Sequence, residues 1–174
     1  MTIGQKFLER SRYFLQNEYI PKITLAIEPL SEEAIWWRPN ESSNAIGNLM
    51  LHLAGNIRQW LVSGVGGTED VRRRSAEFAA REGQPKAALL AHLTAAVTDA
   101  DAVLAGLREE DLLQARKIQG RDVQIFEAVY HVVEHFSTHV GQIILLAKLH
   151  AGEKIRFYDG SDLARPLWRE GTRS

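Results

Sequence analysis

The 174-residue chain contains no cysteine. This absence excludes disulfide bonds, a thiolate nucleophile supplied by the protein, and a structural zinc site with cysteine ligands. It also agrees with a reducing compartment, and we expect a cytoplasmic protein.

The chain also lacks an excess of charge of either sign, because 21 Lys and Arg residues face 22 Asp and Glu residues. There is thus no general electrostatic reason to expect a nucleic-acid partner. The first residues, MTIGQKFLERSRYFLQNEY, carry charges throughout and lack the continuous apolar segment of a signal peptide. No run approaches the roughly 18 apolar residues of a transmembrane span, so no membrane partner is expected.

What the chain has is an ordinary globular composition, with 45% hydrophobic and 25% charged residues. Its length is sufficient for one domain with a core of its own, and it shows no internal repeat or low-complexity tract. We therefore expect a single domain over residues 1–174. Apolar residues recur at helical spacing in four segments, at about residues 3–28, 45–63, 84–106 and 124–150.

Local signals support the ends of these segments. Thr2 and Gln5 fit a capping box at the start of the first helix. Ser43 or Asn44 is suited to cap the second helix, and Pro85 is well placed at the start of the third.

Two connections are substantial. Residues 64–83 are polar and rich in arginine, and predict a long loop or a short irregular helix. Residues 107–123 form the other, in which 114–123 has the character of a short extended piece, although nothing alternates long enough to demand a sheet. The predicted fold is all-α: an antiparallel four-helix bundle with a long connection between helices 2 and 3. In such bundles metal sites are built from side chains on facing helices.

The segment HVVEHFSTHVGQI places His131, His135 and His139 four residues apart. Residues i and i+4 lie on one face of a helix, where two imidazoles can bind one ion. His131 and His139 are about 12 Å apart along the axis, whereas a metal–nitrogen bond is about 2 Å long, so all three cannot share one ion. A single-metal site would use one adjacent pair and a ligand from another helix.

Helical phase separates the three histidines. The core stripe of the last helix spans about 340° to 100°, with His139 near 320°, His135 near 280° and His131 near 240°. This order favours the pair His135 and His139. His52 flanks the apolar stripe of the second helix, so the two sets are able to meet. Two other interpretations stay open, because a histidine near a core is commonly a hydrogen-bonded core residue, and an HxxxH spacing arises by chance.

Four segments resemble the DinB/YfiT-like superfamily in order and spacing. HVVEHFSTHVGQI resembles its last-helix signature, a histidine pair followed by Gly-Gln, with His135, His139, Gly141 and Gln142 at those positions. NAIGNLMLHLAGNIRQW resembles its second-helix signature, whose metal-binding histidine is His52 here. LSEEAIWWRPNESSN resembles the lead-in to that helix, and VRRRSAEFAAREG resembles an arginine-rich loop of one branch. The resemblance does not cover the tail from about residue 155.

The resemblance implies a four-helix bundle, commonly homodimeric, with a divalent metal ion bound by His52, His135 and His139. Imidazole suits zinc, nickel, iron and copper, of which we expect zinc or nickel. His131 then lies beside the site, in its surroundings or lining its pocket, or is a partly exposed histidine outside it.

Three neutral imidazoles leave coordination positions open for water or substrate, as in catalytic zinc sites. Some relatives in the superfamily transfer small molecules onto low-molecular-weight thiols, and others are linked to hydrolysis or isomerisation. We therefore expect a metal-dependent enzyme of thiol-S-transferase or hydrolase type that acts on a small molecule, with a low-molecular-weight thiol as a partner. No catalytic residue is identified. The alternative is a non-catalytic helical binding or interaction protein with a structural or vestigial metal site.

Three further features each carry two interpretations. Trp36 and Trp37 either line the mouth of a pocket or anchor the connection by packing. Arg72–Arg74 either attract an anionic substrate or form a solvated face paired with neighbouring acidic residues. Glu127 and Glu134 either orient a ligand histidine or, as their helical phase favours, face solvent.

Overall fold

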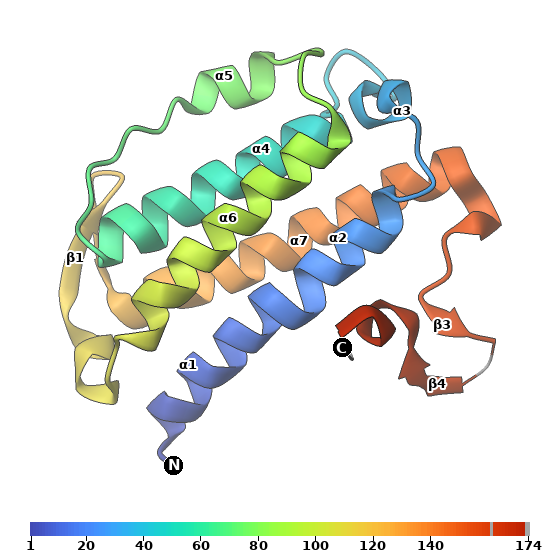
Figure 1. Ribbon diagram of the computed structural model, residues 1–174. Coiled ribbons are helices and arrows are strands. Elements are labelled where there is room, and N and C mark those ends of the chain that lie inside the picture. The colour runs from blue at the N-terminus through green and yellow to red at the C-terminus, as the bar shows by residue number, and fades with distance from the viewer. Residues whose placement is uncertain (161, 173–174) are drawn as a thin grey trace.

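The computed structural model describes residues 1–160 and 162–172, and most of them are helical (Figure 1). Two small antiparallel sheets of two strands each complete the described part. The all-α prediction therefore needs correction, although the helices dominate. The longest of these strands has five residues, too few for an alternating pattern to stand out in the sequence.

The first helical segment consists of α1 (Ile3–Tyr13), a π-helical stretch (Phe14–Tyr19) and α2 (Ile20–Ile27). The predicted capping box is present: the Gln5 N–H donates to Thr2 Oγ1 at 3.2 Å, and the Thr2 N–H donates to Gln5 Oε1 at 2.9 Å. Pro21 lies in the first turn of α2. The wider π-helical turns before it relieve the clash that its ring makes inside a regular helix.

The second segment is α4 (Ile46–Ile57), which continues as a π-helical stretch (Arg58–Val65). Its cap is Ala45, so the prediction of Ser43 or Asn44 was wrong. Asn48 explains the difference, because its Oδ1 reaches back from the first turn and accepts the Ala45 N–H at 3.1 Å. A side chain inside the helix thus satisfies the backbone group that we expected a preceding residue to satisfy.

The third and fourth helices are α6 (Lys86–Ala105) and α7 (Ile125–Ala151), close to their predicted bounds. Pro85 directly precedes α6. Gly152 ends α7 with φ of +52°, a conformation that glycine adopts without strain.

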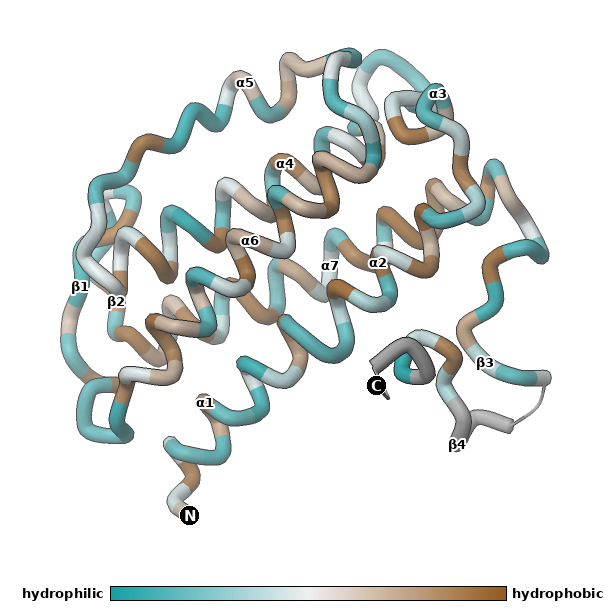
Figure 2. Tube along the Cα trace, viewed as in Figure 1, coloured by the Kyte–Doolittle hydropathy of each residue, from teal (hydrophilic) through white to brown (hydrophobic). Residues whose placement is uncertain are grey.

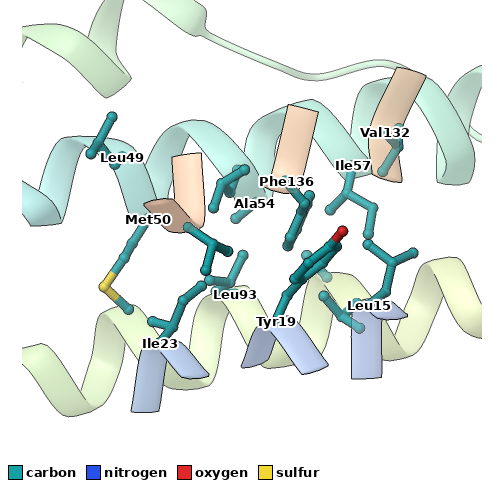
Figure 3. Close-up of a cluster of buried hydrophobic side chains, with 14 of the residues drawn as sticks. Leu15, Tyr19, Ile23, Leu49, Met50, Ala54, Ile57, Leu93, Val132 and Phe136 are labelled. Carbon is teal, nitrogen blue, oxygen red and sulfur yellow. The ribbon is translucent and has the colours of Figure 1, made fainter. Parts of the chain in front are cut away.

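These four segments lie side by side along most of their length (Figure 1). Hydrophilic and hydrophobic residues alternate along each of them (Figure 2). Their apolar faces meet in one core, where the Phe136 ring of α7 lies 6.1 Å from the Tyr19 ring of the first segment (Figure 3). The labelled core side chains come from all four segments: Leu15, Tyr19, Ile23, Leu49, Met50, Ala54, Ile57, Leu93, Val132 and Phe136.

Among the described residues, one helix, α6, is long and apolar enough to cross a membrane by length and composition alone. Its leucines Leu89, Leu93 and Leu104 are buried in the protein core, and the helix packs closely on α4. Of its most apolar stretch, 33% is buried inside the protein.

The connections carry short elements. The helix α3 (Glu32–Trp36) lies between the first two segments, and α5 (Arg74–Ala79) runs along α4 within the long connection after helix 2 (Figure 1). After α6 come a short 3-10 helix (Glu109–Leu113) and a hairpin of β1 (Ala115–Ile118) and β2 (Arg121–Gln124). The hairpin confirms the extended piece predicted at 114–123.

A short 3-10 turn (Gly152–Lys154) follows α7, and the tail then forms the hairpin of β3 (Tyr158–Asp159) and β4 (Asp162–Pro166) and a 3-10 helix (Leu167–Thr172). Trp168 is buried and its indole N–H donates to Glu18 Oε2 at 2.9 Å. Arg169 also pairs with Glu18, and Lys22 Nζ lies 3.1 Å from Oε2. The tail therefore packs on the first helical segment, although the resemblance stops before it.

Candidate metal centre

Three histidines from two helices converge between α4 and α7. His52 comes from α4, and His135 and His139 come from successive turns of α7. One ring nitrogen from each lies within 4.8 Å of the other two. These are the histidines that we expected to form the site, and in the described part of the chain they are a group able to hold a metal ion.

The spacing of two of the nitrogens, those of His52 and His135, fits a common ion. His52 Nε2 and His135 Nε2 are 2.9 Å apart. Two nitrogens bound at about 2.0–2.1 Å would lie that far apart at a bond angle of about 90°, and roughly 3.4 Å apart at the tetrahedral angle. The pair thus suits five- or six-coordinate geometry as it stands, and a small opening of about 0.5 Å would suit tetrahedral zinc.

Hydrogen bonds orient two of the three rings. His52 Nδ1 lies 3.0 Å from Glu77 Oε2, and His139 Nδ1 lies 2.7 Å from Gln142 Oε1. Both oxygens can accept an N–H from the Nδ1 atom that they face, and in that tautomer each Nε2 keeps its lone pair. An imidazole in this state is ready to bind a metal through Nε2. Gln142 belongs to the Gly-Gln step after the histidine pair, and its amide therefore has a chemical role at the site.

His131 lies next to the group and is half-buried. Its ring stacks on His135 with centroids 5.3 Å apart and lies 4.2 Å from the Trp60 ring, while Nε2 is 3.4 Å from Asn56 Nδ2. Helical phase turned His131 furthest toward solvent, but Trp60 from the neighbouring helix covers it. His131 is a neighbour of the group and is not one of its three members.

Burial keeps His135 and His139 uncharged. Desolvation, followed by the charges of neighbouring groups with His139 first, lowers the pKa of His135 to about 3. Desolvation also lowers the pKa of His139, against a smaller opposing effect of its bond to Gln142. These imidazoles are therefore neutral near pH 7, which is the form that binds metal.

A cavity of about 280 Å³ is linked to the group through Gln142, and none of the three histidines lines it. Gln142, which bonds to His139, is one of its lining residues. Besides Gln142, the lining residues include Ser42, Ser43, Asn44, Leu49 and Leu146. None of the described residues that line the cavity is charged.

Comparison with known proteins shows which family the chain belongs to. The profile of the family described as Protein of unknown function (DUF1572) matches residues 2–158, nearly the whole chain. The chain belongs to the DUF1572 family. This family is DinB-like, which confirms the resemblance read from the four segments.

Solved structures support the same fold for this DUF1572 chain. A DinB-like protein from Bacillus cereus is 17% identical with a TM-score of 0.64, and the match covers 85% of this chain and 92% of that one. A DinB-like protein from Bacillus subtilis is 19% identical with a TM-score of 0.63, and the match covers 90% of this chain and 99% of that one. No protein of curated function matches the chain.

The two tryptophans singled out in the sequence contact other parts of this DUF1572 protein. The Trp36 indole N–H donates to Gln84 O at 3.1 Å, and its ring packs on Gly47, so it anchors the connection. Trp37 stacks edge-on with His150 at 4.5 Å. Neither tryptophan lines the cavity beside His139.

The acidic partner of the site was missed by sequence reasoning. Glu127 accepts the Gln124 N–H at the start of α7, and Glu134 is exposed, so neither bonds to a ligand histidine in the described contacts. Glu77, from α5, takes that place and is ion-paired to Arg72. The arginine run is thus divided: Arg72 is buried beside the site, while Arg73 and Arg74 are exposed. A single glutamate in a loop has no periodic signal that marks it as a partner of a residue 25 positions away.

The low histidine pKa values predict the acid response of the metal-free protein. The unfolded chain binds protons at these histidines near pH 6.5, whereas folded His135 resists protonation down to about pH 3. Each histidine whose pKa is lowered in the folded state therefore contributes stability that is present above pH 6.5 and is lost as pH falls. With a chelator present, the urea midpoint should fall between pH 7.5 and pH 5.0. The slope of the unfolding free energy against pH gives the number of protons taken up on unfolding, and His135→Asn should reduce that number by up to about one. An equal dependence in the variant would contradict the buried, neutral state of His135.

Proposed function

We propose that this protein binds one divalent metal ion, zinc or nickel, through His52, His135 and His139. The observation that carries the proposal is the meeting of three imidazole nitrogens within 4.8 Å of one another. The Nδ1 atoms of two of those rings lie within hydrogen-bond distance of side-chain oxygens, which suits the tautomer whose Nε2 binds a metal ion. We further propose that the four long helical segments form the antiparallel four-helix bundle of DinB-like proteins, with the ion between its second and fourth helices.

The proposed activity is that of a metal-dependent enzyme of thiol-S-transferase or hydrolase type. An ion on three neutral imidazoles would act as a Lewis acid and would lower the pKa of a bound water or thiol. His135 and His139 are only half-buried, which leaves a route for a small molecule. The uncharged cavity beside Gln142 is close in volume to the smaller ligand pockets and would hold the neutral part of such a substrate.

A low-molecular-weight thiol is the proposed cosubstrate, because a protein without cysteine needs an external thiol for thiol chemistry. The ion would lower the pKa of that thiol, and the chain would supply the cavity and the oriented ligands. We also propose a cytoplasmic homodimer. The exposed apolar side chains of Ile3, Phe126 and Tyr130 offer a surface for a second copy.

A second candidate function is a non-catalytic binding protein whose ion joins α4 to α7. The depth of His52, which is only 5% exposed, favours it. Chelation separates the two, because the apolar core alone should keep an enzyme folded. Loss of the helical circular dichroism signal at 25 °C on chelation would favour the structural role.

The test of the enzyme proposal is a substrate screen with zinc- and nickel-loaded protein. Small thiols and their S-conjugates, together with simple esters and amides, are incubated with the loaded protein and with the His139→Ala variant. We expect turnover by the loaded protein and loss of at least about a hundredfold in the variant, since the removed group is a metal ligand. Turnover that survives chelation and the substitution would contradict a metal-dependent reaction.

A further inference from the structure

Behind His52, on the side away from the other two histidines, lies a carboxylate from α5. Glu77 Oε2 is 3.0 Å from His52 Nδ1, and Glu77 is a buried residue. The bond joins the long connection after helix 2 to α4. A carboxylate on the second nitrogen of a metal-binding histidine fixes the tautomer and the orientation of the ring and raises its basicity.

A buried arginine accompanies that carboxylate. Arg72 Nε donates to Glu77 Oε1 at 2.7 Å, and Nη2 donates to Oε2 at 2.8 Å, with the Arg72 side chain only 4% exposed. Nη1 donates to Gln59 Oε1 at 2.9 Å. The two parallel bonds from Arg72 orient the Glu77 carboxylate, and Oε2 faces His52 Nδ1 as an acceptor.

Arg72 Nη2 also lies 3.0 Å from His52 Nδ1, so two hydrogen-bond patterns compete. If Nδ1 accepts from Arg72, the proton of neutral His52 is on Nε2 and blocks metal binding. If Nδ1 donates to Glu77, Nε2 is free and points at His135. Arg72 already donates Nη2–H to Glu77 Oε2, and the carboxylate is the stronger acceptor, which favours the second pattern.

The helix α4 has a glycine, Gly55, where this ion pair approaches it. A Cβ added at Gly55 would overlap Glu77 Oε1 and lie 2.9 Å from Arg72 Nε. Glycine at this position, one turn after His52, is what lets the ion pair approach α4. Any larger residue would push the carboxylate away from the imidazole.

A second set of buried contacts anchors α5. The Asn48 side chain is fully buried, and its Nδ2 donates to Glu77 O at 2.8 Å and to Ala80 O at 2.9 Å. Arg38 Nη2 donates to Asn48 Oδ1 at 2.7 Å. The backbone on both sides of Phe78 is thus fixed to α4, so Glu77 is held in place by more than its own ion pair.

We propose that Glu77 is a positioning residue of the metal centre: it holds His52 in the Nδ1–H tautomer with Nε2 aimed at His135 and His139. Arg72 keeps Glu77 ionised and in place, and Gly55 leaves room for both. This inference rests on the proposed metal binding. It assigns the arginine-rich connection a role in building the site, in place of attracting an anionic substrate through Arg72.

The first measurement uses metal-free protein, so that it does not depend on metal binding. Long-range ¹H–¹⁵N NMR spectra of the imidazoles report which nitrogen of His52 carries the proton. We expect the Nδ1–H tautomer in the wild type. We expect loss of that preference when Arg72→Met and Glu77→Leu are combined, a change that replaces the ion pair with apolar groups and avoids leaving a buried charge unpaired. An Nε2–H tautomer in the wild type would overturn the assignment.

The second measurement is affinity for zinc and nickel, determined by competition with a chromophoric chelator. Glu77→Gln and the double variant should each weaken binding by about 10–100-fold. Asp101→Asn is the matched control, because it removes the charge from another two-bond ion pair, with Arg12, and neither residue bonds to the three histidines in the described contacts. It should leave both affinities within about twofold of the wild type.

Affinities of Glu77→Gln and the double variant within twofold of the wild type would overturn the role of Glu77, provided that circular dichroism shows both folded. Absence of zinc and nickel binding by the wild type would instead overturn the proposed function. The tautomer of His52 would still decide whether Glu77 positions that ring.

Discussion

Alanine at His52, His135 or His139 is expected to weaken zinc and nickel binding by more than about a hundredfold. Loss of a group that only orients a ligand already costs 10–100-fold, and loss of the ligand itself removes a metal bond. The three nitrogens lie within 4.8 Å of one another, so each contributes to the same position. Metal content of the purified variants and their affinity in competition assays provide the measurement.

His131→Ala is the matched control for this series, because His131 lies one turn before His135 on the same helix. It stacks on His135 and Trp60 but is outside the group of three. We expect its metal affinity to fall by less than about tenfold, through lost packing of the His135 ring. A loss for His131→Ala as large as for His139→Ala, or full metal content in His139→Ala, would contradict the ligand assignment.

Alanine at Phe136 is expected to have the largest effect on stability, about 3–5 kcal/mol. Its ring is 0% exposed and packs against Tyr19 at the centre of the core between the helices (Figure 3). Truncation removes that contact and leaves a cavity that the surrounding helices fill only in part. For a chain of this length the melting temperature should fall by roughly 6–20 °C. Urea and thermal unfolding in a chelator measure the change without a contribution from metal.

Phe126→Ala on the same helix is the control. Phe126 is 42% exposed, although its ring lies 4.9 Å from Phe7. It should cost no more than about 1.5 kcal/mol, because a large part of its surface is already in water and less apolar area is lost than at Phe136. Equal losses for the two variants would mean that the core is not centred on Phe136.

The sequence by itself determined the features that depend on near neighbours along the chain. The helical bounds followed from apolar periodicity and from caps such as Thr2 and Gly152, which act within one turn. The pair His135 and His139 followed from the four-residue repeat and from phase. The assignment of His52 needed the family resemblance as well, because nothing within α4 tells which side chain of α7 it meets.

Only the tertiary structure decided the features that depend on distant contacts. The cap of α4 was misplaced because Asn48 bonds back to Ala45 and forward to α5 at the same time. His131 is covered because Trp60 comes from another helix. The tail docks through Trp168 on Glu18, 150 residues earlier. None of these contacts has a period or a spacing in the sequence.

Glu77 shows the physical reason most clearly. A periodic pattern records which face of a helix is buried, but it does not record which loop returns to cover a polar group at the edge of that face. The carboxylate reaches His52 because Asn48 anchors α5, Gly55 leaves space, and Arg72 offsets the cost of burying the charge. Local periodicity therefore identified the pair of histidines on α7 that join the group of three, while the packing of a loop on a helix determined how His52 is held.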